Sequence, residues 1–213
     1  MIEISIPINK QQLKGNLVVP EDAKAIILFA HGSGSSRFSP RNQYVATVLN
    51  NAGLATLLFD LLTESEEQVD EITGVLRFDI ELLAYRLIKA TQWVLKTPEL
   101  KDLKIGYFGA STGAAATLIA ANANPKWVYA IVSRGGRPDL AKDALPRVIT
   151  PTLLIVGDLD TEVIELNREA MSHMSPKTEK YMELVPGATH LFEESGALEE
   201  VASKAKDWFL QHL

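Results

Sequence analysis

The sequence contains no cysteine among its 213 residues. It therefore has no disulfide, no thiolate metal site and no cysteine nucleophile. No apolar run approaches the roughly 20 residues that a membrane-spanning helix needs. The amino terminus, Met1 to Pro7, alternates apolar and polar residues and lacks the basic start and continuous apolar run of a signal peptide. These absences lead us to expect a cytoplasmic protein without a membrane partner.

Basic residues are also in the minority. The chain has 21 Lys and Arg against 27 Asp and Glu, a formal net charge of −6. Proteins that bind nucleic acid need a basic face that displaces counterions, and no long basic run is present, so we expect no nucleic-acid partner. With 46% hydrophobic and 23% charged residues, the chain suits one globular domain over residues 1–213. Its oligomeric state does not follow from the sequence.

Strand and helix patterns alternate along most of the chain. Residues 2–8 and 12–19 alternate polar and apolar side chains, which predicts an antiparallel hairpin. Further strands are predicted at 25–30, 54–59, 103–108, 127–132, 151–157 and 178–185. Helices are predicted at 39–51, 76–96, after residue 111, at 161–174 and at 196–212. This alternation predicts an α/β fold with a mostly parallel, twisted sheet and helices on both faces. The acidic residues 61–74 read as a solvated loop or a short mobile helix.

The most informative stretch is residues 104–116, in which Gly109-Ala110-Ser111-Thr112-Gly113 joins a predicted strand to an alanine-rich helix. This is the G-x-S-x-G pattern, whose serine sits on a sharp, strained turn that lifts the hydroxyl clear of the sheet. Gly109 and Gly113 stand where a Cβ would collide with the opposite limb of that turn. The pattern alone also fits an ordinary glycine-rich turn. Its position between a strand and a helix favours a nucleophilic Ser111.

A nucleophilic serine needs a base, and the base needs an acid that orients it. His190 lies in a loop that leaves the last predicted strand, at the edge where parallel strands gather functional groups. His31 precedes the serine beside glycines, so a loop-positioning role is expected. His173 lies within a predicted helix, and His212 is expected to be exposed near the carboxyl terminus. His190 is therefore the predicted base.

Two aspartates are candidates for the acid. Asp158 and Asp160 both lie in the loop after the strand 151–157. Asp160 is favoured because it lies farther past the strand end and can turn toward a neighbouring loop. Asp158 remains the alternative, and the other aspartate would then cap a helix or a turn. The order serine, aspartate, histidine along the chain is the one expected of an elbow serine on such a sheet.

These motifs and their order resemble the α/β-hydrolase superfamily and, within it, the compact dienelactone-hydrolase-like branch. The resemblance covers nearly the whole chain, from the leading hairpin through His31-Gly32, Ser111, Asp160 and His190. It implies an α/β-hydrolase fold without a large cap domain, and a Ser-His-Asp triad that needs no metal or cofactor. Dienelactone hydrolases proper carry cysteine at the elbow. Serine at this position favours an ordinary serine esterase.

The resemblance also implies an oxyanion hole. In this family, the residue after the His-Gly pair and the residue after the nucleophile each donate a backbone N–H group, which here implies Ser33 and Thr112. Amides fixed where negative charge develops stabilise the tetrahedral intermediate, and losing one donor typically costs about 3 kcal/mol. Because backbone groups act, substituting either side chain is expected to do little.

The substrate is the least constrained element. Residues 134–150 are too short for a large lid, so the predicted site is open and favours a small, soluble ester or thioester. Arg37, Arg134 and Arg137 fall in loops at the same edge and are candidates for binding a carboxylate or phosphate of the substrate. The alternative is that all three are solvated surface arginines.

Two other functions fit parts of the sequence. Gly32-Ser33-Gly34 with Asp60 imitates the glycines and ribose-binding acid of a dinucleotide-binding oxidoreductase, but Arg37 stands in place of the third glycine. That function also leaves the serine, aspartate and histidine unexplained. The second alternative is a non-catalytic ligand-binding module on the hydrolase fold, and the presence of all three residues argues against it.

Overall fold

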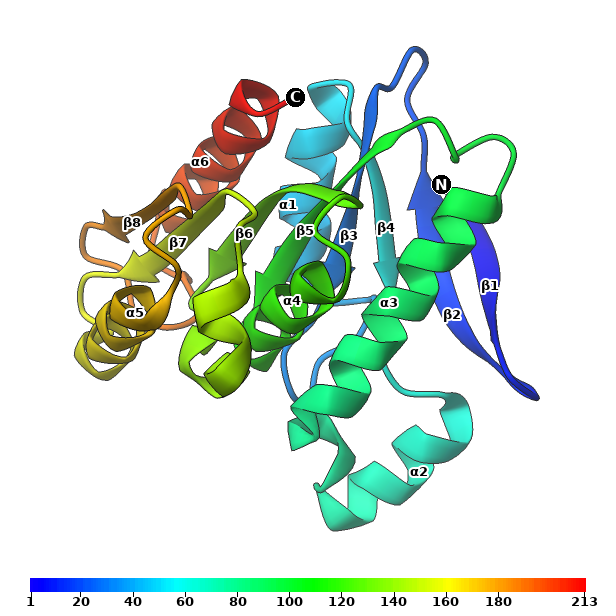
Figure 1. The fold of residues 1–213 in the computed structure, drawn as a ribbon, viewed down its shortest axis with the longest axis horizontal. Coiled ribbons are helices and arrows are strands. Elements are labelled where there is room, and N and C mark those ends of the chain that lie inside the picture. Colours follow the sequence, from blue (N-terminus) through cyan, green and yellow to red (C-terminus); the bar gives the residue numbers. More distant parts are fainter.

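An eight-stranded sheet runs through the computed structural model, which describes residues 1–213 (Figure 1). The strands are β1 Ile2–Ile8, β2 Gln11–Val18, β3 Ala25–Ala30, β4 Ala55–Phe59, β5 Lys104–Ala110, β6 Val128–Arg134, β7 Thr152–Gly157 and β8 Lys180–Val185. Their order across the sheet is β1-β2-β4-β3-β5-β6-β7-β8. The hairpin β1-β2 is antiparallel and joins β4 in antiparallel register, while all pairs from β4 to β8 are parallel. The predicted fold class is confirmed.

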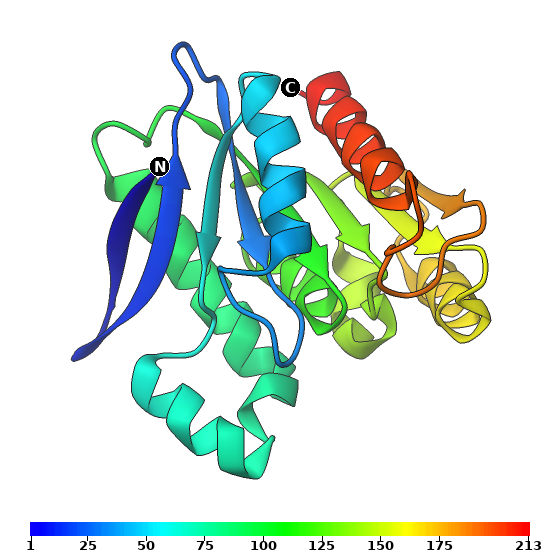
Figure 2. The same cartoon turned by 180° about the vertical axis from the view of Figure 1, so that it is seen from behind.

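Helices cover both faces of this sheet. They are α1 Pro40–Asn51, α2 Glu64–Thr73, α3 Ile80–Lys96, α4 Thr112–Ala123, α5 Thr161–His173 and α6 Ala197–Gln211, with 3-10 segments η1 Leu76–Phe78 and η2 Pro138–Arg147. Figure 2 shows α1 and α6 on one face, and Figure 1 shows α3, α4 and α5 on the other. None of the helices combines the length and the apolar character needed to cross a membrane.

The sheet separates two apolar cores. The larger has 33 buried residues and lies between the sheet and the α3, α4 face, while the other has 22 and lies beneath α1 and α6. The strands β3, β4 and β7 lie inside the sheet and are buried along their whole length, which explains why their sequences are mostly apolar.

The acidic segment is a helix anchored to the rest of the fold. Thr63 and Glu66 form a reciprocal capping box at the start of α2. Glu66 also forms an ion pair with Arg86 of α3, and Asp70 pairs with Arg77 at 2.6 Å. The solvated-loop alternative for residues 61–74 is therefore wrong.

The predicted helix 76–96 is divided at Asp79. The carboxylate of Asp79 accepts the Leu82 N–H group at 3.0 Å and so begins α3 afresh after η1. Helix α2 lies at the edge of the sheet where the parallel strands end, and the loops that follow these strands lie along the same edge (Figure 1).

Candidate active site

Ser111 occupies the sharp turn between β5 and α4. Its backbone has φ 49° and ψ −122°, a conformation that a residue with a side chain adopts only under constraint from its surroundings. The constraint is visible in the neighbouring glycines. A Cβ on Gly109 would lie 2.6 Å from the Ala114 Cα, and one on Gly113 would lie 2.7 Å from the His31 carbonyl oxygen. The small residues predicted at the elbow are therefore required by its geometry.

Backbone hydrogen bonds hold the elbow against the end of β6. The Ser111 N–H group donates to the Arg134 carbonyl oxygen at 3.3 Å, and the Arg137 N–H group donates to the Ser111 carbonyl oxygen at 3.0 Å. The loop 134–137 is thus a direct support for the serine.

His190 and Asp160 come together at the same edge. His190 Nδ1 lies 2.7 Å from Asp160 Oδ2. Asp160 is at the N-cap position of α5, yet its side chain forms no capping hydrogen bond and turns to the histidine instead. The Asp160 carboxylate is 14% exposed and the His190 ring 40% exposed, so the pair faces solvent through the imidazole.

The two candidate aspartates have different partners. Asp158 Oδ1 accepts the Gly187 N–H group at 2.7 Å and so holds the turn that precedes His190. Asp160 alone reaches the imidazole, and Asp158 has the turn role expected of the other aspartate.

The serine and the histidine lie in adjoining loops without a direct hydrogen bond. Gly135 follows the residue whose carbonyl holds Ser111, and a Cβ placed on it would lie 3.6 Å from His190 Cε1. Catalytic hydrogen bonds are often long in unliganded structures and shorten in the substrate complex. A direct hydrogen bond between Ser111 and His190 is part of the function proposed below.

The two residues predicted to supply the oxyanion donors are hydrogen-bonded to each other through the Thr112 side chain. The Ser33 N–H group donates to Thr112 Oγ1 at 3.0 Å. Thr112 opens α4, where backbone N–H groups lack intrahelical partners and the helix dipole favours an anion. The structure thus gives the Thr112 side chain a contact that the sequence analysis does not foresee, because it considers only the backbone.

His31 holds its loop, as predicted. The Leu61 N–H group donates to His31 Nε2 at 3.1 Å, so the proton of the neutral ring is on Nδ1, which lies 2.9 Å from the Gly32 carbonyl oxygen. Burial lowers the pKa of His31 below its usual value. Both ring nitrogens are occupied, and the ring is unavailable as a base.

The remaining histidines lie elsewhere. His173 is the exposed last residue of α5. His212 is not exposed as expected, since its ring packs against Trp208 with centroids 4.1 Å apart and its side chain is only 11% exposed. Neither is part of the site.

The three candidate arginines have different environments. Arg37 forms an ion pair with Asp60 and also donates its backbone N–H to that carboxylate at 2.8 Å. Arg137 forms two hydrogen bonds with Asp139, at 2.9 and 2.8 Å. Arg134 is buried, with 8% of its surface exposed, and its Nε and Nη1 atoms have no partner. A solvated surface arginine is the wrong description of Arg134.

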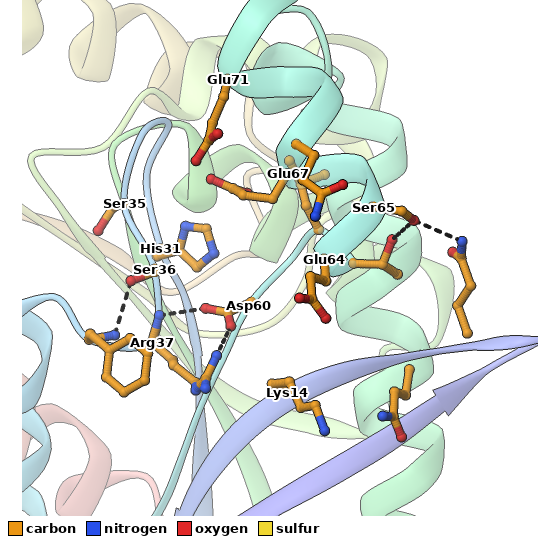
Figure 3. A pocket seen from close by; sticks show the side chains of 16 residues that line it. Lys14, His31, Ser35, Ser36, Arg37, Asp60, Glu64, Ser65, Glu67 and Glu71 are labelled. Carbon is orange, nitrogen blue, oxygen red and sulfur yellow. Dashed lines mark hydrogen bonds and ion pairs between the residues drawn. The ribbon is translucent and has the colours of Figure 1, made fainter.

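A cavity of about 730 Å³ opens beside the His31 loop (Figure 3). Its walls come from β2, the loop after β3, the end of β4 and α2, and are almost entirely polar. The Arg37–Asp60 pair lies in this wall, and both Asp60 oxygens accept hydrogen bonds from Arg37. The acid that a dinucleotide-binding protein would offer to a ribose is therefore already engaged. Ser111, Asp160 and His190 do not line this cavity.

The chain is similar to known proteins over its full length. The sequence model of the Dienelactone hydrolase family matches residues 13–213. A crystal structure of a dienelactone hydrolase from Anabaena variabilis is 56% identical, with a TM-score of 0.97, and the match covers 100% of this chain and 97% of that one. Est1E from Butyrivibrio proteoclasticus shares the fold at 16% identity, with a TM-score of 0.81 and coverage of 99% and 98%.

Curated relatives are longer. Two strains of Mycobacterium tuberculosis carry a protein named "Putative phosphoribosyl transferase" that is 55% identical over 212 residues. The match covers 99% of this chain and 46% of that protein, so the chain spans about half the length of these relatives. The family match, the solved structure and the elbow geometry agree, and the chain belongs to the dienelactone hydrolase family of α/β hydrolases.

Proposed function

We propose that the chain is a serine hydrolase that cleaves carboxylic ester or thioester bonds of small, soluble substrates through an acyl-enzyme. The observation that carries the proposal is the 2.7 Å contact between His190 and Asp160 at the edge where the strained elbow presents Ser111. Family membership supports hydrolysis, and the chemistry follows from these three side chains.

In this mechanism, His190 Nε2 takes the proton of the Ser111 hydroxyl as the serine oxygen attacks the substrate carbonyl. Asp160 keeps the proton of the imidazole on Nδ1, which leaves Nε2 free to accept, and it stabilises the imidazolium that forms. The histidine then protonates the leaving group, and a water attacks the acyl-enzyme with the same histidine as base.

The oxyanion of each tetrahedral intermediate would bind the N–H groups of Ser33 and Thr112. The Ser33 N–H group donates to the Thr112 hydroxyl at 3.0 Å, which holds it beside the first turn of α4, and it would exchange this hydroxyl for the oxyanion when the intermediate forms. The Thr112 N–H group lies at the start of α4, and donors that are fixed before the reaction need no reorganisation when charge develops.

A hollow of about 420 Å³ borders Thr112 and suits the acyl or alcohol part of a small ester. Its walls combine apolar side chains with charged ones, contributed by Phe78, Asp79, Ile80, Glu81, Thr112, Arg137, Leu140 and Lys142. The hollow is open to solvent, which supports a small and soluble substrate rather than a long lipid.

The test measures hydrolysis of 4-nitrophenyl acetate and of an acetyl thioester by the wild-type protein and three variants. Ser111→Ala and His190→Ala should each lose about 10³-fold or more in kcat, since the triad acts as a unit. His173→Ala is the matched control, because that histidine is exposed on α5 and away from the site. Retention of most activity by either triad variant would show that the assignment is wrong.

A further inference from the structure

Asn167 is a buried polar residue that the proposed mechanism does not use. It lies on α5 and is 0% exposed. Its side-chain Nδ2 donates to the Val163 carbonyl oxygen at 2.7 Å and to the Gly136 carbonyl oxygen at 2.9 Å, while its Oδ1 has no partner. Burying a polar group that is only partly hydrogen-bonded costs free energy. An apolar side chain would avoid this cost, so an amide at this position requires a reason.

The bond to Gly136 joins α5 to the loop after β6. The Gly136 carbonyl and the Arg137 N–H are the two ends of one peptide group, which is planar and rigid. Asn167 holds the oxygen end of this peptide, and the N–H end donates to the Ser111 carbonyl oxygen at 3.0 Å. A single rigid peptide therefore connects Asn167 to the residue that forms the elbow.

The peptide benefits from an external hold because it follows two glycines. Gly135 has φ 50°, and Gly136 lets the next peptide turn over more readily than any other residue would. A larger residue cannot restrain the loop at Gly136, since a Cβ there would lie 2.5 Å from the Ala114 Cβ and nearer still to Ser133 Oγ. A donor from another element can restrain the peptide instead, and the side chain on α5 supplies one.

The same helix carries the proposed acid. Asp160 is at the N-cap position of α5, seven residues, or about two turns, before Asn167. The Asp160 carboxylate lies 2.7 Å from His190 Nδ1. Helix α5 is therefore connected to the histidine at its start and to the turn of Ser111 two turns later.

We propose that Asn167 is a positioning residue for Ser111. By holding the peptide between Gly136 and Arg137, it fixes the carbonyl of the strained serine and keeps the elbow in register with the helix that carries Asp160. The inference rests on the proposed function and adds to it a residue that touches neither the substrate nor the reacting atoms. An error of about 1 Å in the position of a reacting group costs about 10²-fold in rate, so a remote hydrogen bond of this kind matters for catalysis.

Two variants remove the donor and differ in their packing. Asn167→Leu fills a similar volume, whereas Asn167→Ala leaves space. Thr91→Val is the matched control, because it also removes a buried hydrogen bond, the 2.6 Å contact between Thr91 of α3 and Tyr107 of β5, which does not involve the loop after β6.

Single-turnover hydrolysis of 4-nitrophenyl acetate, with enzyme in excess, measures the rate of serine attack separately from the affinity for the ester. Both Asn167 variants should lose about ten- to a hundredfold in the rate at saturation, because the serine is misplaced, while the half-saturating concentration changes less than about threefold. Thr91→Val should keep both values within about threefold of the wild type.

Hydrogen exchange of the Arg137 amide, followed by NMR, supplies a readout that is independent of hydrolysis. This N–H group donates to the Ser111 carbonyl oxygen, so its exchange reports directly on the peptide that Asn167 holds. Both Asn167 variants should exchange this proton about two- to tenfold faster, as expected for the loss of one hydrogen bond. Thr91→Val should exchange it at the wild-type rate.

Three results would overturn the inference. A loss of rate in Asn167→Ala but not in Asn167→Leu would show that side-chain volume matters and the hydrogen bond does not. Unchanged exchange of the Arg137 amide in both variants would refute the hold on the peptide. Faster exchange with wild-type rates of serine attack would refute the positioning of Ser111.

A failure of the proposed function is distinguishable from these results. If the wild-type protein releases no 4-nitrophenol, the proposed ester hydrolysis fails. The exchange of the Arg137 amide then still confirms or refutes the connection from Asn167 to the turn of Ser111.

Discussion

Gly113→Ala tests the geometry of the elbow, because helix propensity and the structure predict opposite effects of this substitution on the stability of the protein. Gly113 is in the first turn of α4, and alanine is normally better than glycine within a helix by about 0.8–1.0 kcal/mol. Helix propensity alone therefore predicts a more stable protein. The structure predicts a less stable one, because the new Cβ would lie 2.7 Å from the Ala30 carbonyl carbon and from the His31 carbonyl oxygen, and nearer still to the Ala30 oxygen.

The atoms that would be contacted belong to the backbone and cannot rotate away. Separations under 3.0 Å are essentially never seen for a real Cβ, so α4 must move away from the end of β3. Overpacking costs about 1–3 kcal/mol, and because the contacted atoms belong to the backbone we expect the upper part of that range, about 2–3 kcal/mol, which exceeds the gain of about 0.8–1.0 kcal/mol in helix propensity. We therefore expect a net loss of about 1–2 kcal/mol in the free energy of unfolding.

The displacement would also affect the proposed chemistry. Moving α4 separates Thr112 from the Ser33 N–H group and shifts the turn that carries Ser111. Urea unfolding followed by circular dichroism measures the stability, and 4-nitrophenyl acetate hydrolysis measures the activity. A urea midpoint that stays the same or rises in Gly113→Ala would refute the close approach between α4 and β3.

Three further predictions concern single side chains. Thr112→Val removes the acceptor of the Ser33 N–H group, so kcat should fall several-fold and the free energy of unfolding by about 0.5–1.5 kcal/mol. Thr112→Ser keeps the hydroxyl and should retain both values. A valine variant with wild-type kcat would contradict this prediction. Asp160→Asn should lower kcat by about 10³–10⁴-fold with the fold intact by circular dichroism, because the imidazole would adopt the wrong tautomer; a loss below tenfold would exclude the acid role. Burial lowers the pKa of His31, so its imidazole stays neutral in the folded protein, whereas in the unfolded chain it takes up a proton below about pH 6.5. The free energy of unfolding should therefore fall between pH 7 and pH 5, by at most about 1.4 kcal/mol per pH unit from this group. Urea unfolding at several pH values measures this dependence, which should be weaker in His31→Gln. An equal dependence on pH in the variant would show that His31 does not contribute.

The fold could be predicted because its signals are local. A strand that is buried on both faces must be a continuous apolar run, so β3, β4 and β7 are visible in the sequence without any knowledge of their neighbours. The elbow is equally local, since five consecutive residues carry both the serine and the glycines that its turn requires.

The environments of the site residues are set by contacts between distant segments, and composition does not reveal them. Asp158 and Asp160 are two residues apart with the same chemistry, and only the position of the loop after β8 determines which one reaches His190. The three arginines also look alike in sequence. Their differences depend on Asp60, 23 residues from Arg37, and on the lack of any hydrogen-bond partner for Arg134 Nε and Nη1.

Two local signals were available but were outweighed. Thr63 and Glu66 have the spacing of a capping box, which would have predicted the start of α2. The high density of acidic residues favoured a solvated segment instead. Asp79 has a side chain suited to helix capping, yet the continuous apolar spacing across residues 76–96 concealed the break between η1 and α3.

The most direct test of the central claim is labelling with a fluorophosphonate probe, which reacts with an activated serine. Intact-mass analysis and peptide mapping should show rapid addition of one probe, located on Ser111, and no addition in Ser111→Ala or His190→Ala. Absence of labelling in the wild-type protein, or labelling that persists in His190→Ala, would contradict the claim that Ser111 is a nucleophile activated by His190.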